Sequence, residues 1–531
     1  MHKSTFITDL PSLVQGGFIP ARGVGEGWVD VDYQTPALQG IGLATGVDSG
    51  AMELVLDLNL EGSFTLHLAL FTQTGLRVWL DGEKGYREFV TKHGGYAFQE
   101  CRLHTADLTR RRLHIAPKTG VSAEPAFLGY IRAEPCEAPH KNARNFIATN
   151  DGYSWVALDG IESERDVWKL FTPLRDSDYG LMIWGPGGAD YTCCHQTQVG
   201  TVTPLETTHD FRRHHRTHSQ QLKPFMASRG DILEAAVAAA RDVDIKIHFC
   251  IRVEAFMGPF PNDYHFASEY FLAHPEYRCR DEHGDVIMRL SYAYSQVQEH
   301  MLEYFRELLK YSPDGLSLAF NRSLPMMICE EPILAEHERL FGCRPILPDE
   351  VDSDEMVRAR MMLMNRFLER VRALLDENGL ELSCIVPGEV ETNQIAGLDL
   401  LGLAEKKIFD AVLLHSGGQH ALGAAPWNEA YWHELKNKTK VFLYAWGGSN
   451  SHVETARFIK ENVLETGFAG GFFWDTESFP ENPYNWHVMR QGGTVEFLDG
   501  VISGDTASPT ILPCTWIRAV KLGRYHPGRS Y

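Results

Sequence analysis

Two carboxylates directly follow an apolar run late in the chain. The stretch AGGFFWDTES, from Ala469 to Ser478, passes from glycine, phenylalanine and tryptophan to Asp475 and Glu477. A buried strand that merely reaches solvent would produce the same letters. Two carboxyl groups beside aromatic rings are also what cleavage of a glycosidic bond requires, because one group protonates the leaving oxygen and the other acts as nucleophile or base.

Acids that follow other apolar runs are candidates for the second carboxyl group. The stretch MICEEP supplies Glu330 and Glu331, and PGEVETN supplies Glu391. We predict a catalytic pair that consists of Asp475 and one of these three glutamates. The structural alternatives are that Glu330 and Glu331 stand in a solvated turn before a helix, where the dipole favours negative charge, and that Glu391 lies in a loop.

Aromatic, amide, imidazole and charged residues accompany these acids at the ends of the same runs. Sugars stack their C–H faces on aromatic rings and pair their hydroxyls with carboxylates, amides and guanidinium groups. The predicted substrate-binding residues are Trp184, Arg252, Glu254, Asn321, Arg322, His415, Trp446, Trp474 and Glu477. Core packing of the tryptophans and a buried ion pair between Arg252 and Glu254 are the structural alternatives.

One histidine-rich stretch, THDFRRHHRTHSQ, contains candidate metal ligands. Its histidines, His209, His214, His215 and His218, match neither the HExxH nor the zinc-finger spacing. We therefore expect no metal and no cofactor, and we interpret the stretch as a polar loop. No phosphate-binding lysine follows the glycine-rich stretches, and no GxSxG sequence supports a serine nucleophile.

Strand-like runs that alternate with amphipathic helices must position these residues. From about residue 150 the runs are YGLMIW, DIKIHFCIRV, DVIMRL, DGLSLAF, LELSCIV, FDAVLLH, KVFLYAW and FAGGFFW, of which DVIMRL is the weakest. Eight such units predict an α/β fold, a (β/α)8 barrel with its active site at the carboxyl ends of the strands. A doubly wound open sheet is the alternative, but no GxGxxG follows a strand.

The remaining segments are predicted to be rich in β-structure. Residues 1–145 alternate apolar and polar side chains in short runs separated by Gly, Pro and Asp, which predicts a β-sandwich of jelly-roll type that could bind carbohydrate. We assign residues 146–490 to the barrel and residues 491–531 to a short β-rich extension that packs on a β-domain.

Composition limits the partners. The chain has 531 residues and a formal net charge of −20, which opposes a nucleic-acid partner or an anionic membrane. No apolar run approaches the roughly 20 residues of a membrane span. The start of the chain lacks the pattern of a signal peptide, so we expect a cytoplasmic protein, although a trimmed signal would leave the same sequence.

Three stretches carry a resemblance to a known group: PDGLSLAFNRSLPMMICEEPILAEHERLFG, LSYAYSQVQEHMLEYFRELL and GFFWDTES. Over roughly residues 175–490 the chain resembles the glycosyl-hydrolase-like family 10 group and related uncharacterised carbohydrate-active (β/α)8 barrels with an N-terminal jelly-roll-like domain. The resemblance implies a barrel that acts on carbohydrate.

One position departs from that group. Its fourth strand usually reads DG-x-x-x-D-F, whereas this chain has Ala319 at the acid position. The work of the missing acid then falls to Glu330, Glu331 or Glu391, or the chemistry differs and uses His415, or the barrel binds sugar without cutting it.

We therefore predict a glycoside hydrolase with a two-carboxylate mechanism that acts from the end of an oligosaccharide or glycoside. A non-catalytic sugar-binding protein on a degenerate barrel and a metal-dependent hydrolase or lyase are the alternatives. The expected partner is a carbohydrate substrate. A homo-oligomer, the identity of the sugar and a retaining or inverting outcome stay open.

Overall fold

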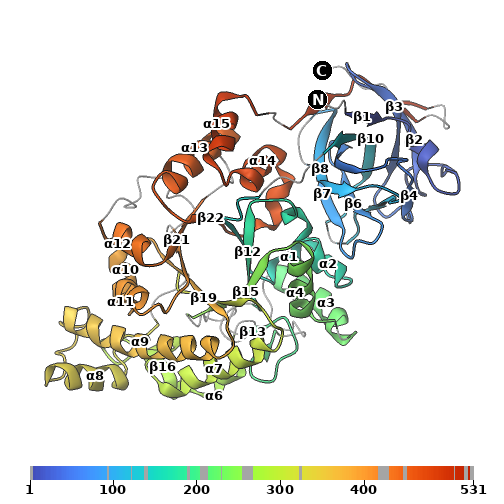
Figure 1. Cartoon of the computed structure of the whole chain (residues 1–531). Helices are drawn as coiled ribbons and strands as arrows, with labels where there is room; N and C mark the ends of the chain where they lie inside the picture. Colours follow the sequence, from blue (N-terminus) through green and yellow to red (C-terminus); the bar gives the residue numbers. More distant parts are fainter. Residues whose placement is uncertain are drawn as a thin grey trace.

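Eight parallel strands close into a barrel, and helices surround it (Figure 1). The strands are, in order around the barrel, β11 (Phe146–Asn150), β12 (Tyr179–Trp184), β15 (Lys246–Arg252), β18 (Gly315–Ala319), β19 (Glu381–Pro387), β20 (Ala411–His415), β21 (Lys440–Tyr444) and β22 (Gly470–Phe473). The pairing of β22 with β11 closes the ring, with Phe472 opposite Ile147. The closure confirms the predicted barrel and excludes the open doubly wound sheet.

The structure is a computed structural model, and it describes most of the chain. The described residues are 4–91, 95–120, 122–136, 142–187, 192–203, 213–228, 230–253, 267–321, 326–415, 430–445, 451–506, 509–519 and 524–526.

One predicted barrel strand is wrong, and one barrel strand was not predicted. The run DVIMRL forms β17 (Val286–Leu290), which pairs with β16 (Arg278–Arg280) in a separate two-stranded sheet. Its first four residues alternate between exposed and half-buried and only Leu290 is buried, whereas a barrel strand is covered on both faces. The first barrel strand is instead β11, the short run FIATN, all five residues of which are buried.

The helices cover the barrel with their apolar faces. They are α1 (Ser154–Asp159), α2 (Arg165–Trp168), α3 (Arg213–Ala227), α4 (Ile232–Asp242), α6 (Glu269–Ala273), α7 (Ser295–Leu309), α8 (Glu331–Phe341), α9 (Asp354–Asp376), α10 (Val390–Ile395), α11 (Leu400–Glu405), α12 (Ala430–Lys438), α13 (His452–Phe458), α14 (Pro483–Gln491) and α15 (Val495–Ser503). In α7 the predicted face of Val297, Met301, Phe305 and Leu308 is buried in the main core, as helical spacing requires. The stretch that we interpreted as a polar histidine loop is helical from Arg213 onward.

The N-terminal residues form two antiparallel sheets. The larger sheet has the order β23-β8-β5-β10-β3-β2-β24-β25, with β1 on β10, and the smaller has the order β4-β9-β6-β7. The bounds are β1 (Thr5–Ile7), β2 (Val29–Gln34), β3 (Gln39–Thr45), β4 (Leu54–Leu56), β5 (Ser63–Phe71), β6 (Gly75–Leu80), β7 (Arg87–Val90), β8 (Ala97–Asp107), β9 (Leu113–Pro117) and β10 (Ala126–Pro135). Apolar residues of both sheets, such as Leu68 and Val78, belong to one buried cluster, so the sheets share a core.

The end of the chain returns to this N-terminal unit. The first part of the predicted β-rich extension is helical, because α15 occupies Val495–Ser503. Three strands follow it: β23 (Ile511–Pro513), β24 (Trp516–Ala519) and β25 (Arg524–His526). β23 pairs with β8 and β24 pairs with β2, so segments from both ends of the chain lie side by side in one sheet (Figure 1).

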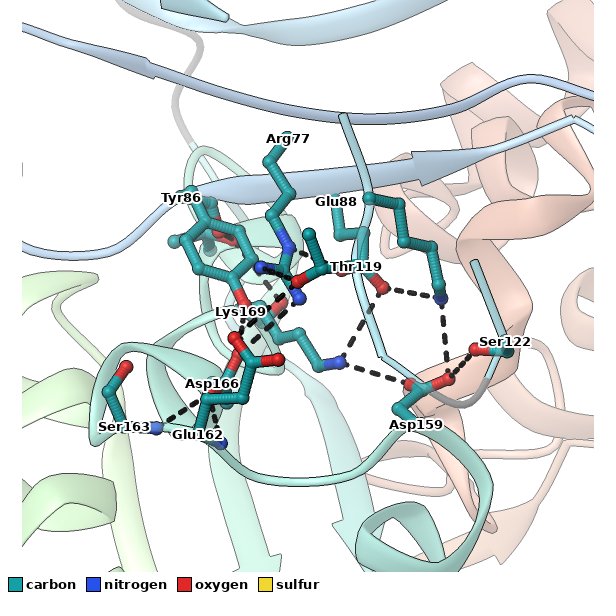
Figure 2. Close-up of polar contacts among 12 residues, drawn as sticks. Arg77, Tyr86, Glu88, Thr119, Ser122, Asp159, Glu162, Ser163, Asp166 and Lys169 are labelled. Carbon is teal, nitrogen blue, oxygen red and sulfur yellow. Dashed lines mark hydrogen bonds and ion pairs between the residues drawn. The ribbon is translucent and has the colours of Figure 1, made fainter. Parts of the chain in front are cut away.

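A buried network of ion pairs joins the N-terminal unit to the barrel (Figure 2). Lys118 Nζ lies 2.7 Å from Glu88 Oε1 and 3.3 Å from Asp159 Oδ1 at the end of α1. Lys169 Nζ, after α2, lies 3.1 Å from Asp159 Oδ2. Burial alone would raise the pKa of Asp159, but the charges of Lys169 and Lys118 outweigh it and hold the pKa at about 2. The network therefore fixes α1 and α2 against the smaller sheet.

Candidate active site

A pocket lies at the carboxyl ends of the barrel strands, the end at which barrel enzymes place their active sites. We call it the mouth pocket. The described residues that line it are Thr149, Asn150, Asp151, Ile183, Gly185, Gly187, Cys250, Arg252, Ala319, Ile385, Trp474 and Asp475. They follow or end six different strands, so the closure of the barrel brings together positions that are far apart in the chain. Arg252, Trp474 and Asp475 are among the predicted site residues.

Asp475 adopts a backbone conformation that is unusual for a residue with a side chain. Its φ of 49° and ψ of 64° lie in the left-handed region, which costs a non-glycine residue about 1–2 kcal/mol. Contacts with β11 hold this turn: the Asp475 N–H donates to the Thr149 hydroxyl at 3.0 Å, and the Thr476 hydroxyl donates to the Thr149 carbonyl at 3.2 Å. Residues held in such conformations cluster at functional sites.

Glu477 is half-buried next to this turn and keeps its proton unusually well. The Asn150 side-chain amide donates to Glu477 Oε2 at 3.2 Å. Burial, and after it the negative charge of Asp475, raises the pKa of Glu477 to about 8. At neutral pH the site therefore holds a protonated carboxyl group beside other acidic residues. Two carboxyl groups with separated pKa values can divide the roles of acid and base.

The raised pKa of Glu477 gives a prediction about stability. Glu477 binds its proton more tightly in the folded state than in the unfolded state. Its contribution to the free energy of unfolding is therefore fully present below about pH 4.5 and is lost as the pH rises through about 8. We expect Glu477→Gln to be free of this pH-dependent loss of stability and therefore to be more stable than the wild-type protein at pH 8.5. Melting temperatures of both proteins between pH 5 and 9 measure this, and parallel curves would contradict it.

Asp151 is a mouth-pocket carboxylate that sequence reasoning missed. It follows β11, and its Oδ1 accepts hydrogen bonds from the N–H groups of Tyr153 at 3.0 Å and Ser154 at 2.8 Å. These bonds fix the carboxylate at the start of α1. Its charge also contributes to the raised pKa of Glu477. The rule that acids at strand ends mark the site would have found Asp151 if FIATN had been recognised as a strand.

Aromatic rings gather at the carboxyl ends of β20, β21 and β22. His415, at the end of β20, stacks on Tyr444 with ring centroids 4.9 Å apart. Trp474 meets the His415 ring edge-on at 5.2 Å. All three side chains are half-buried, and Trp474 reaches the mouth pocket. Half-exposed rings at a pocket suit the stacking of a sugar face.

Asn321, two residues after the end of β18, carries an unsatisfied amide. Neither its Oδ1 nor its Nδ2 has a hydrogen-bond partner in the described part of the chain, although both atoms are buried. A buried polar group without a partner costs about 1–3 kcal/mol. Such an amide is suited to a hydroxyl-bearing ligand.

Other predicted site residues have structural roles or are not described. Trp184 is fully buried and stacks on Phe171 with centroids 5.4 Å apart, so it packs the core and offers no platform to a sugar. Glu254, Arg322 and Trp446 lie outside the described residues.

The three glutamates predicted to pair with Asp475 do not line the mouth pocket. Glu330 is fully buried and accepts the N–H groups of Arg280 at 2.7 Å and Ile328 at 2.9 Å. The Glu331 side chain is 64% exposed and pairs with Arg344 at 2.6 Å, and Glu391 is exposed in the first turn of α10. None of the three therefore shares the mouth pocket with Asp475, whereas Asp151 lines it and Glu477 lies close enough for the charge of Asp475 to raise its pKa.

The buried position of Glu330 predicts that its removal lowers the free energy of unfolding. Glu330→Ala leaves two partly buried N–H donors without their acceptor, each at a cost of up to about 1–3 kcal/mol. We expect the free energy of unfolding in urea to fall by about 2–4 kcal/mol. Glu331→Gln, at the adjacent exposed position, is the matched control and should change it by less than about 1 kcal/mol. Equal effects of the two substitutions would contradict this role.

Among the described residues, no three His, Cys, Asp or Glu side chains gather as metal ligands. Of the histidine-rich stretch, His209 lies outside the described residues, and His214, His215 and His218 belong to α3. No helix in the described ranges combines the length and the apolar character that a membrane crossing requires.

No protein-family model matches the chain, and no curated protein matches it. Similar solved structures include α-L-fucosidase isoenzyme 2 from Paenibacillus thiaminolyticus, at 13% identity and a TM-score of 0.43 over 68% of this chain and 50% of that chain. The α-galactosidase from Thermus thermophilus has 11% identity and a TM-score of 0.36 over 88% and 90% of the two chains. Catalytic domain 2 of the group II chitinase from Ostrinia furnacalis has 10% identity and a TM-score of 0.36 over 70% and 99%.

The chain spans half the length of the fucosidase chain it matches. These similar structures are glycoside hydrolases by name, and likeness of this degree identifies no activity for the chain. The resemblance to the glycosyl-hydrolase-like family 10 group has no matching family model.

Proposed function

We propose that the chain is a glycoside hydrolase in which Glu477 and Asp475 are the two catalytic carboxyl groups. The observation that carries the proposal is the position of Asp475 in the mouth pocket, close enough to Glu477 for its charge to add to burial in raising the pKa of Glu477. A carboxyl group that keeps its proton to about pH 8 can act as a general acid at neutral pH. Asp475 then serves as nucleophile or as base.

In the proposed reaction Glu477 is the acid, and Asp475 is the nucleophile or the base. Glu477 donates its proton to the glycosidic oxygen as the bond between that oxygen and the anomeric carbon breaks. Asp475 stabilises the positive charge on the ring by its own negative charge, or bonds to the anomeric carbon. If Asp475 has bonded to the anomeric carbon, water attacks this carbon, the bond to Asp475 breaks, and Glu477 takes the proton of the water, which restores the starting protonation. If Asp475 acts as base instead, it takes that proton, and both groups return to their starting protonation by exchange with solvent.

The remaining residues of the mouth would bind the sugar. The His415, Tyr444 and Trp474 rings offer a stacking surface, while Arg252 and Asn321 offer hydrogen-bond donors to hydroxyls. We propose action from the end of an oligosaccharide or glycoside, as the sequence suggested. We also interpret the two N-terminal sheets with their shared core as a β-sandwich of the jelly-roll type.

A sugar-binding barrel without turnover is the second candidate, and Ala319 favours it. This residue lines the mouth pocket at the position where the resemblance implies an acid. The two candidates predict the same ligands and differ only in whether the ligand is cleaved.

A panel of nitrophenyl glycosides and oligosaccharides tests the proposal. We expect release of nitrophenol or of a reducing sugar from at least one substrate, with the rate unchanged after dialysis against EDTA. Calorimetry with the same oligosaccharides detects binding. Binding without release by the wild-type chain would support the sugar-binding barrel, and loss of activity in EDTA that one metal restores would support metal-dependent chemistry.

A further inference from the structure

A second cavity lies between strands of both N-terminal sheets and the segment around α14, and we call it the interface cavity. Its volume is about 510 Å³, within the range of about 300–1,000 Å³ that small-molecule sites occupy. β5, β7, β8 and β10 supply one wall, and the segment from Pro480 to Gln491, which includes α14, supplies the other. None of its residues lines the mouth pocket.

The interface cavity carries more positive than negative side chains. Four arginines and two glutamates line it, together with His67 and His487. Arg132 forms ion pairs with both glutamates: its Nη2 lies 2.8 Å from Glu100 Oε2 and its Nη1 lies 3.3 Å from Glu134 Oε2. Both carboxylates of the cavity are therefore engaged by Arg132, and neither pairs with Arg87, Arg102 or Arg490.

Two of these arginines are buried without a carboxylate partner. Arg87 and Arg490 are each only 5% exposed, and no carboxylate of the described residues lies within 4.0 Å of either guanidinium group. Arg87 Nε has no hydrogen-bond partner in the described part of the chain, and Arg490 donates from Nη1 to the Asp176 backbone carbonyl at 2.7 Å. Arg102 reaches the Asp176 carboxylate only at 3.9 Å.

Unpaired buried cations are costly, so they indicate a missing counter-charge. A buried charge is normally paired or hydrogen-bonded, because its loss of hydration costs several kcal/mol. Burial and the nearby charge of Arg102 lower the pKa of Arg87 to about 9 and lower that of Arg490 well below its usual range. The three guanidinium groups therefore create a positive field in a confined space.

We propose that the interface cavity binds a small organic oxyanion, a compound that bears phosphate or carboxylate groups, through Arg87, Arg102 and Arg490. The planar fork of a guanidinium group matches the oxygens of both groups and binds them in pairs. Phe89, Trp486 and Pro483 provide apolar surface for the carbon skeleton of the ligand. The site is separate from the proposed glycosidase chemistry and does not depend on it.

Thermal unfolding and calorimetry of the full chain with two probes test this proposal. Inorganic phosphate and citrate are each added at constant ionic strength, with sodium chloride as the reference salt. We expect a higher melting temperature and saturable binding with at least one probe, and the probe that binds identifies the anionic group. No saturable binding of either probe would overturn the proposal.

Variants of the arginines separate a ligand site from a structural role. Arg87→Met removes an unpaired buried charge at similar volume, so we expect the ligand-free protein to melt no lower than wild type while probe affinity falls at least about tenfold. Arg102→Met, at a partly exposed position, should weaken binding in the same way if Arg87→Met folds poorly. Arg344→Met is the control, because Arg344 pairs with Glu331 and Glu338 on the surface. Undiminished probe binding by Arg87→Met and Arg102→Met would overturn the proposal.

Discussion

Glu477→Gln is expected to lower kcat/KM for glycosides with poor leaving groups by about 10²–10⁴-fold, the usual contribution of a general acid. Glutamine keeps the volume and can still accept the hydrogen bond from Asn150. It has no proton to give to the leaving oxygen. The loss should therefore shrink for dinitrophenyl glycosides, whose leaving group needs little protonation. Initial rates across a series of aryl glycosides measure this dependence.

Asp475→Asn provides the complementary test. Its loss should be as large for dinitrophenyl glycosides as for poor leaving groups, because a nucleophile or base is needed whatever the leaving group. Glu331→Gln, on the exposed surface, should leave kcat/KM unchanged and serves as the control. A uniform loss in both Glu477→Gln and Asp475→Asn, or full activity in either, would contradict the assignment of roles.

Glu88→Gln is expected to lower the free energy of unfolding by about 3–5 kcal/mol, the usual cost of breaking a buried ion pair. Glu88 lies 2.7 Å from Lys118, 3.0 Å from Arg77 Nε and 3.5 Å from Lys169, and its side chain is 8% exposed. Its neutralisation leaves three buried cations to share the remaining acids, Asp159 and Asp166. Urea denaturation followed by tryptophan fluorescence measures the change.

Glu405→Gln is the matched control for that experiment. Glu405 pairs with Lys438 at 2.8 Å, but its side chain is 62% exposed, so water screens the pair. The expected change is less than about 1 kcal/mol. If the two substitutions cost the same, the network between the smaller sheet and α1 and α2 is not a main source of stability.

Seven of the eight barrel strands follow from the alternation of apolar runs with helices. The exceptions have a physical cause. FIATN is short and ends in polar residues, yet packing on both sides buries Thr149 and Asn150 as completely as Phe146. DVIMRL has the composition of a strand, but a run of that length carries no information about its partner, and it pairs with β16 outside the barrel.

The sequence indicated where the candidate site lies but not what each of its acids does. Position at a strand end was enough to select Asp475, Arg252 and Trp474, which line the mouth pocket, because it depends on topology alone. The roles of individual acids depend on what surrounds them after folding. Glu330 looks like a free acid in the sequence, but in the fold its carboxylate accepts hydrogen bonds from the N–H groups of Arg280 and Ile328. Glu477 instead holds its proton more tightly, because burial and the negative charge of Asp475 raise its pKa.

The strand order of the larger N-terminal sheet has a consequence for biosynthesis. β2 and β8 leave the ribosome hundreds of residues before β24 and β23, the strands that pair with them. Until Ile511 has been translated, both borders of the nascent sheet stay open to pairing with another chain. A ribosome that stops late on the mRNA would therefore release a polypeptide with the complete barrel sequence and with two strand edges whose backbone groups are unpaired.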